Sequence, residues 1–208
     1  MRITQIVYKV DDLAKAMECA SSKGLAAEYG RERNPYNAFI YFSDETFLEL
    51  VENMGIPRMI KGIMRIFNRG FVKRFEQWDN AGEGPLGIGI QVTESQLSQI
   101  EMYLKEKYQI RSFRLTSKRK DVHNVLFEAK CLFPENVYLP FFVTKYKNVK
   151  NGALHKNLNG DKQVKHLNIS LQKKEYEIVN DLFSRFELWN GLGASIRKGN
   201  YDFEVEIL

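Results

Sequence analysis

Residues 3–52 read ITQIVYKVDDLAKAMECASSKGLAAEYGRERNPYNAFIYFSDETFLELVE and carry the clearest folding signal in the chain. Alternating β-branched residues predict a strand over 3–10. Asp11 and Asp12 can cap a helix over 13–23. Three short strands, rich in aromatic and aliphatic residues, are then expected at 25–29, 36–42 and 46–52. The predicted order of elements is therefore β-α-β-β-β.

A second copy of this order begins about 82 residues further along the chain. Its strands are expected at 86–92, 110–116, 122–127 and 138–143. Thr93 caps the helix between the first two of them, and Gln96 is placed to complete a capping box. When the copies are aligned, Asn37 superposes on Asn124, and a longer second hairpin takes up residues 131–136.

A third stretch begins in the same way, with a strand at 164–170 and a helix at 174–186, and closes with strands at 194–197 and 202–208. The predicted fold class is α+β, with paired β-α-β-β-β modules and a partial third module. Five segments follow from this reading: a first module at 1–52, a helical insertion at 53–84, a second module at 85–143, a polar connector at 144–163 and a partial third module at 164–208.

The composition is that of an ordinary globular protein. Among 208 residues, 44% are hydrophobic and 27% are charged, which excludes collagen-like and disordered chains. The N-terminus lacks the pattern of a signal peptide, so we expect a cytoplasmic protein. The cysteines Cys19 and Cys131 give no disulfide framework. We expect Cys19 to pack in the first helix and Cys131 to be exposed in the longer hairpin.

Basic residues cluster in residues 56–78, where six lysines and arginines face one glutamate. Apolar residues recur here with a helical period, and Gly62 and Gly70 can break the segment into two helices. Three interpretations stay open: a helix packed across the sheet, a lid over a cavity, or a membrane-surface helix. The first predicts that Phe67 and Phe71 are buried. We expect neither membrane contact nor nucleic-acid binding, because no binding motif accompanies the charge.

Two segments resemble the glyoxalase-like branch of the vicinal-oxygen-chelate superfamily. They are residues 6–13, IVYKVDDL, and residues 37–42, NAFIYF, which are followed by FLEL at 47–50. LPFFV at 139–143 is similar to the last strand of the second module in that family. The resemblance implies curved mixed sheets around a shared cavity, and it allows a homodimer.

The resemblance also implies four positions at which catalytic members hold a divalent metal. In this chain those positions contain Gln5, Glu49, Gly87 and Phe141. Only Glu49 is a good ligand, whereas a stable transition-metal site needs at least three. We therefore assign no metal ligands and expect no cofactor, with a divalent metal as the disfavoured alternative.

The candidate site is centred on Glu49, as the catalytic or ligand-binding carboxylate. It alternates with two leucines along its strand, so it faces either solvent or a polar cavity. Gln5, Asn37 and Asn124 are candidate ligand-binding residues, and the loop residues Arg31 and Arg33 are candidate countercharges for Glu49 or for an anion.

The predicted function is binding of a small polar or anionic molecule by a glyoxalase-like protein without the usual metal. One alternative is a lyase, isomerase or dioxygenase-type enzyme with an altered metal site, or with a metal-free site that uses Glu49 as a base. The other is a peripheral membrane or interaction protein that uses the basic helix at 56–78.

Overall fold

The first β-α-β-β-β module forms as predicted. The structure is a computed structural model and describes residues 2–56, 58–67, 69–120, 126–147, 159–188 and 193–207. The module consists of β1 (Ile3–Lys9), α1 (Leu13–Ser22), β2 (Glu28–Tyr29), β3 (Asn37–Tyr41) and β4 (Phe47–Val51). The carboxylate of Asp12 accepts a hydrogen bond from the backbone N–H of Lys15 (3.0 Å), which caps α1.

The second module has the same order of elements. It consists of β5 (Gly84–Val92), α4 (Glu94–Tyr108), β6 (Ser112–Lys120), β7 (Leu126–Pro134) and β8 (Phe141–Thr144). The predicted capping box is confirmed, because Thr93 Oγ1 accepts from Gln96 N (3.2 Å) and Gln96 Oε1 accepts from Thr93 N (2.9 Å).

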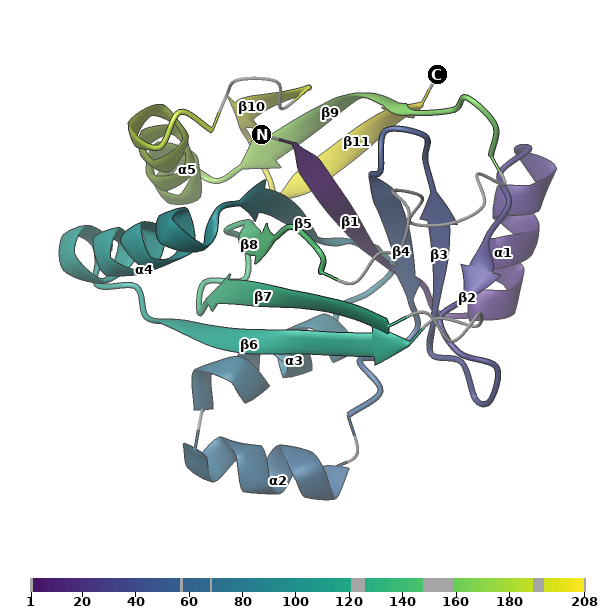
Figure 1. The fold of residues 1–208 in the computed structure, drawn as a ribbon, viewed down its shortest axis with the longest axis horizontal. Helices are drawn as coiled ribbons and strands as arrows, with labels where there is room; N and C mark the ends of the chain where they lie inside the picture. Colours follow the sequence, from purple (N-terminus) through teal and green to yellow (C-terminus); the bar gives the residue numbers. More distant parts are fainter. Residues whose placement is uncertain are drawn as a thin grey trace.

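The two modules share one sheet, in the order β2-β3-β4-β1-β5-β8-β7-β6. Their first strands, β1 and β5, pair antiparallel at its centre (Figure 1). Gln5 pairs with Gly89 and Val7 with Gly87, so an approximate two-fold relation maps Gln5 onto Gly87. The chain is thus an α+β protein with paired modules, as expected.

The two faces of this sheet are covered by different elements. We call the face that carries Gln5, Val7, Glu49 and Phe141 the inner face, and the opposite one the outer face. On the outer face, α1 packs against Ile40 and Leu50, while α4 packs against strands β7 and β8. The insertion between the modules covers part of the inner face.

That insertion forms two helices, α2 (Arg58–Phe67) and α3 (Arg69–Asp79), so the break that the glycines allowed does occur. Figure 1 shows α3 beneath β6 and β7, with α2 beyond it. Phe71, Phe75 and Trp78 of α3 are buried against the inner face, as the packing interpretation predicted for Phe71. The side chain of Phe67 lies outside the described residues.

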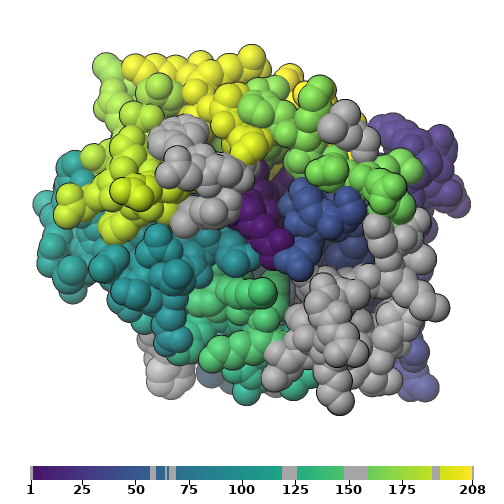
Figure 2. All heavy atoms as spheres, turned by 45° about the horizontal axis from the view of Figure 1, so that its top comes forward, coloured from purple at the N-terminus to yellow at the C-terminus, as the bar shows by residue number. Residues whose placement is uncertain are grey.

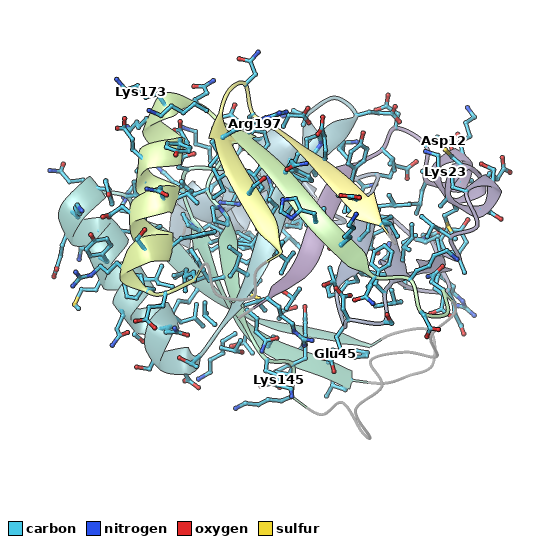
Figure 3. All side chains as sticks on the ribbon, turned by 90° about the horizontal axis from the view of Figure 1, so that it is seen from above. Asp12, Lys23, Glu45, Lys145, Lys173 and Arg197 are labelled. Atoms are coloured by element: carbon cyan, nitrogen blue, oxygen red, sulfur yellow. The ribbon has the colours of Figure 1, made fainter. Side chains whose placement is uncertain are left out.

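The C-terminal unit contains β9 (Val164–Leu171), α5 (Lys173–Arg185), β10 (Ala194–Lys198) and β11 (Asp202–Ile207). It begins as the modules do, but β10 pairs directly and parallel with β9, and β11 pairs on the other side. Its apolar residues join the core on the outer face of the large sheet. Figure 2 shows this unit, in green to yellow, as a surface layer beside the N-terminal strand in purple. Exposed charges such as Lys173 and Arg197 point outward from it (Figure 3).

Three details of the sequence interpretation are corrected by the structure. Strand β7 continues to Pro134, so Cys131 is a buried strand residue and not part of an exposed hairpin. Cys131 pairs with Val143 as Asn37 pairs with Val51, so Cys131 holds the place in the second module that we gave to Asn124. Cys19 is exposed on α1 and does not pack in its core.

The predicted polar connector is partly anchored to the first module. Asn159 is 4% exposed, and its amide group donates hydrogen bonds to the carbonyls of Ala26 (3.0 Å) and Tyr41 (2.9 Å). Residues 148–158 and Asn124 lie outside the described residues.

Candidate functional site

Three neighbouring strands bring the predicted polar residues together on the inner face. Glu49 of β4 pairs with Val7 of β1 on one side and with Phe39 of β3 on the other. Side chains alternate along a strand, so residues two apart lie on the same face. Gln5 is two residues from Val7, and Asn37 is two residues from Phe39, so both lie on the same face as Glu49 and diagonally across from it. Leu48 and Leu50 face the opposite way, toward α1.

The carboxylate of Glu49 is held by both amides. Asn37 Nδ2 donates to Glu49 Oε1 (2.6 Å), and Gln5 Nε2 donates to Glu49 Oε2. All three side chains are half-buried. Hydrogen bonds to a charged group are stronger than neutral ones, and they fix the position of the carboxylate. Each carboxylate oxygen has two acceptor sites.

Gly30 makes room for this arrangement, and the sequence analysis missed its role. A Cβ atom built on Gly30 would overlap Asn37 Oδ1 and would lie 2.9 Å from Phe39 Cε2. The backbone N–H of Gly30 also donates to the carbonyl of Asn37 (2.9 Å). Any larger residue at position 30 would push the Asn37 amide away from its place beside Glu49.

The arginines expected near Glu49 lie elsewhere. Arg31 is exposed; its Nε donates to the carbonyl of Asn34 (2.8 Å), and its guanidinium lies 4.4 Å from the centre of the Tyr36 ring. Arg33 is also exposed. A buried cation of the inner face is instead Lys9, whose Nζ donates to the carbonyl of Glu52 (2.7 Å). Alternation from Gln5 places Lys9 on this face and was the signal that could have found it.

The equivalent face of the second module is filled with aromatic rings. Phe141 takes the place of Glu49 and stacks on Phe133, with ring centres 5.0 Å apart. A Cβ on Gly87, the counterpart of Gln5, would lie only 2.9 Å from the Trp78 ring. Burial raises the pKa of the Cys131 thiol to about 12. This half of the inner face is therefore part of the apolar core.

Helix α3 closes this aromatic half. Its fully buried Arg74 donates to the carbonyls of Pro134 (2.6 Å), Asn136 (3.1 Å) and Leu139 (3.2 Å). Desolvation lowers the pKa of Arg74 to about 10, which keeps the guanidinium charged near neutral pH. Arg74 thus attaches α3 to the loop before β8.

The four family metal positions do not fit a metal centre. Gln5 already donates to Glu49, Gly87 has no side chain, and Phe141 is stacked in the core. Among the described residues, no three His, Cys, Asp or Glu side chains are grouped so that they could hold a metal ion. The arrangement offers a fixed carboxylate and two amides for direct hydrogen bonding.

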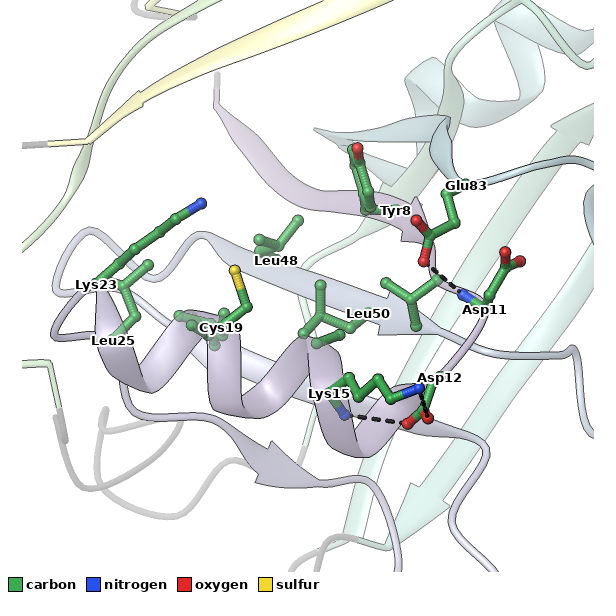
Figure 4. Close-up of a pocket in the computed structure, with 14 residues that line it drawn as sticks. Tyr8, Asp11, Asp12, Lys15, Cys19, Lys23, Leu25, Leu48, Leu50 and Glu83 are labelled. Atoms are coloured by element: carbon green, nitrogen blue, oxygen red, sulfur yellow. Dashed lines mark hydrogen bonds and ion pairs between the residues drawn. The ribbon is translucent and has the colours of Figure 1, made fainter.

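A hollow of about 610 Å³ lies on the outer face between α1 and strands β1 and β4. Its floor is apolar and includes Ile40, Leu48 and Leu50, and Cys19 of α1 lies along it (Figure 4). The charged groups at its rim are partly used by one another: Lys15 pairs with Asp12 (3.3 Å), and Glu83 accepts from the backbone of Asp11 (2.9 Å). The sequence analysis did not predict this hollow.

Comparison with known proteins informs the fold. No family model matches the chain, and the search of curated proteins finds no match. A hypothetical protein from Staphylococcus aureus is similar in structure, with a TM-score of 0.64 and 13% identity, over 99% of this chain and 90% of that chain.

Methylmalonyl-CoA epimerases also match, more weakly. The Streptomyces coelicolor epimerase in complex with 2-nitronate-propionyl-CoA has a TM-score of 0.41 and 15% identity, over 69% of this chain and 96% of that chain. An epimerase in complex with methylmalonyl-CoA and NH4+ has a TM-score of 0.41 and 15% identity, over 69% of this chain and 93% of that chain. The similarity to the Staphylococcus aureus protein extends over nearly the whole chain, including the C-terminal unit, and shows that this fold occurs in another protein.

Proposed function

We propose that the inner face of the first module binds a small polar molecule, with Glu49 as the acceptor at the centre of the site. The observation that carries this proposal is the pair of amide hydrogen bonds to the two oxygens of Glu49. A half-buried carboxylate loses part of its hydration, so donors must replace the lost water. Gln5 and Asn37 supply two such donors, and a ligand hydroxyl, amide or ammonium group supplies the next.

The charge of the site favours a ligand with a hydrogen-bond donor over a purely anionic one. Glu49 is itself negative, and Arg31, the nearest expected countercharge in the sequence, is occupied by Asn34 and Tyr36. An anionic ligand would therefore need a donor group that meets Glu49 and a cation elsewhere. The buried Lys9 lies on the same face but donates to backbone carbonyls.

A second candidate function uses the same carboxylate as a base. A general base must be held within hydrogen-bond reach of the proton that it removes. The two amides orient Glu49, and such an arrangement suits a metal-free proton transfer on a bound substrate. This activity would need the same binding site, so the binding test comes first.

The test is a screen of small molecules with hydroxyl, amide or ammonium donors by ligand-observed NMR, followed by titration of the hits. Glu49→Gln removes the charge and keeps the shape of the side chain. We expect it to weaken binding of site-specific hits by roughly tenfold or more, because hydrogen bonds to charged groups are the stronger ones. The free energy of unfolding should stay within about 1 kcal/mol of the wild type, because the neutral amide still accepts one hydrogen bond.

Glu206→Gln is the matched control, since Glu206 is an exposed strand carboxylate of β11 that pairs with Lys165 (2.7 Å). It should leave hit affinity unchanged. Reaction of the Cys19 thiol with a chromogenic disulfide distinguishes binding at Glu49 from binding in the outer-face hollow, because a molecule bound beside α1 would slow that reaction. The proposal would be overturned by hits that slow the reaction of Cys19 and bind the Glu49→Gln variant as tightly as the wild type. A fall of about 1–3 kcal/mol in stability, without loss of binding, would assign Glu49 a structural role.

A further inference from the structure

Helix α2 lies against α3 and is joined to it by ion pairs. Lys61 pairs with Asp79 and Arg65 pairs with Glu76, so both basic residues are joined to α3 by ion pairs. The sequence of α2, RMIKGIMRIF, contains no acidic residue. The basic side chains of Lys61 and Arg65 therefore contact α3.

The apolar side of α2 is correspondingly exposed. Ile60 and Ile63 have 43% and 53% of their surface accessible. Residues three apart lie on the same side of a helix, so these two isoleucines form one surface. In Figure 1, α2 is the outermost element on the inner-face side, with α3 between it and the sheet.

A basic hollow lies at the junction of the two helices. It has a volume of about 510 Å³ and is lined by Arg65, Arg69, Val72, Lys73 and Glu76. Arg69 and Lys73 are exposed, and neither has a carboxylate partner within the part of the chain that the structure describes. The hollow thus offers the side chains of Arg69 and Lys73 to an anionic group.

We propose that α2 docks on an anionic membrane surface, with Ile60 and Ile63 in the interface and with Arg69 and Lys73 on lipid phosphate groups. The helix has 10 residues and is about 15 Å long, half the thickness of a bilayer core. It therefore lies in the plane of the interface. No helix among the described residues is long and apolar enough to span a membrane. The proposal does not depend on Glu49, which lies on a separate element.

The positive charge of α2 favours a lipid surface over a second copy of this chain as the partner that contacts it. A symmetric contact between two α2 helices would bring together two basic helices that contain no acidic residue, and like charges repel. An anionic bilayer instead attracts basic residues near its surface and accepts aliphatic side chains at the acyl boundary. Both features occur together at α2.

The experiment is co-sedimentation of the full chain with vesicles of phosphatidylcholine alone or of phosphatidylcholine with phosphatidylglycerol. We expect binding to the anionic vesicles only, and weaker binding as salt is raised. Ile60→Gln with Ile63→Gln should lower the partition coefficient by roughly tenfold or more, since two buried aliphatic side chains are lost. Arg69→Gln with Lys73→Gln should lower it in anionic vesicles by a similar factor.

Matched controls come from other helices. Met102 of α4 is 55% exposed, so Met102→Gln removes an equally exposed apolar side chain elsewhere. Lys105→Gln with Lys174→Gln removes two exposed charges. Neither control should change partition beyond the general effect of charge. Absence of vesicle binding, equal losses in the controls, or a dimer by light scattering that Ile60→Gln with Ile63→Gln dissociates would each overturn the proposal.

Discussion

The two modules share a topology and differ on their inner faces. In the first, β1, β3 and β4 present Gln5, Asn37 and Glu49, which hydrogen-bond to one another. The strands that correspond to them in the second module present Gly87, Cys131 and Phe141, which are packed among aromatic rings. The same topology therefore carries a polar site on the inner face of the first module and an apolar core on that of the second.

Helix α3 accounts for the difference. It lies against the second module and brings Phe71, Phe75 and Trp78 onto an inner face that would otherwise be open to solvent. Phe71 contacts Phe113, with ring centres 4.6 Å apart, and Trp78 lies over Gly87. A glycine at this position is needed because any Cβ would meet the indole ring. The presence of α3 and the absence of polar residues from the inner face of the second module are therefore two parts of the same change in packing.

The largest effect is expected when the polar character of the first module is imposed on the second. Phe141→Glu would place a carboxylate between Phe133 and Trp78, where Phe141 is now 2% exposed. An unpaired buried charge is among the costliest changes, so we expect a loss of more than about 4 kcal/mol in the free energy of unfolding. Urea denaturation measures it.

Phe141→Leu is the control for this substitution, because it changes shape and adds no charge. It should cost about 1–1.5 kcal/mol. If Phe141→Glu were no more destabilising than Phe141→Leu, the second module would have room for a solvated polar group. The contrast between the two inner faces would then be one of residue type alone.

The next comparison is between the two helices of the insertion. Phe71→Ala removes a buried ring from α3 and should lower the free energy of unfolding by about 3–5 kcal/mol. Ile63→Ala on α2 removes an exposed side chain and should change stability by no more than about 0.5 kcal/mol. Thermal melts of both variants measure this. Equal losses would show that α2 is packed as firmly as α3.

The sequence predicted the architecture well because its periodic signals are local. The first module and the capping box at Thr93 follow from alternation, caps and turns. Alternation also placed Glu49 on the opposite face from Leu48 and Leu50, but it left open whether that face is solvent or a cavity. The basic helix at 56–78 was harder, because one amphipathic pattern continues through two helices. Its apolar side is buried in α3, where Phe71 packs on the sheet, and exposed in α2 at Ile60 and Ile63.

The errors of the sequence interpretation arise where the register of strand pairing determines which residues are equivalent. Asn124 seemed equivalent to Asn37 because both precede an aliphatic-aromatic strand, yet β7 extends to Pro134 and its pairing aligns Cys131 with Asn37. The role of Gly30 depends on a contact with a side chain seven residues away. Such contacts follow from the relative placement of strands, which local patterns do not encode.

A smaller effect tests the packing around Asn37. Gly30→Ala adds a methyl group that overlaps the Asn37 amide, so we expect a loss of about 1–3 kcal/mol and weaker binding of any ligand of Glu49. Gly62→Ala is the matched change on α2, where a Cβ meets nothing within 4 Å. It should raise stability by about 0.5–1 kcal/mol, since alanine favours a helix. Chemical denaturation and the hit titrations measure both variants.

The smallest change leaves the fold intact and asks whether the second inner face is sealed. Cys131 is buried there, in the place of Asn37, and burial raises its pKa to about 12. The thiolate is the reactive form, so Cys131 should resist a thiol reagent at neutral pH, whereas the exposed Cys19 reacts. We expect one fast thiol per folded chain and two after denaturation; in Cys19→Ser the fast thiol should be gone. Rapid reaction of Cys131 in folded Cys19→Ser would mean that α3 lifts from the sheet on the timescale of the assay. The aromatic half would then be a cavity that opens when α3 moves away. The inner faces of the two modules would then differ mainly in whether α3 covers them.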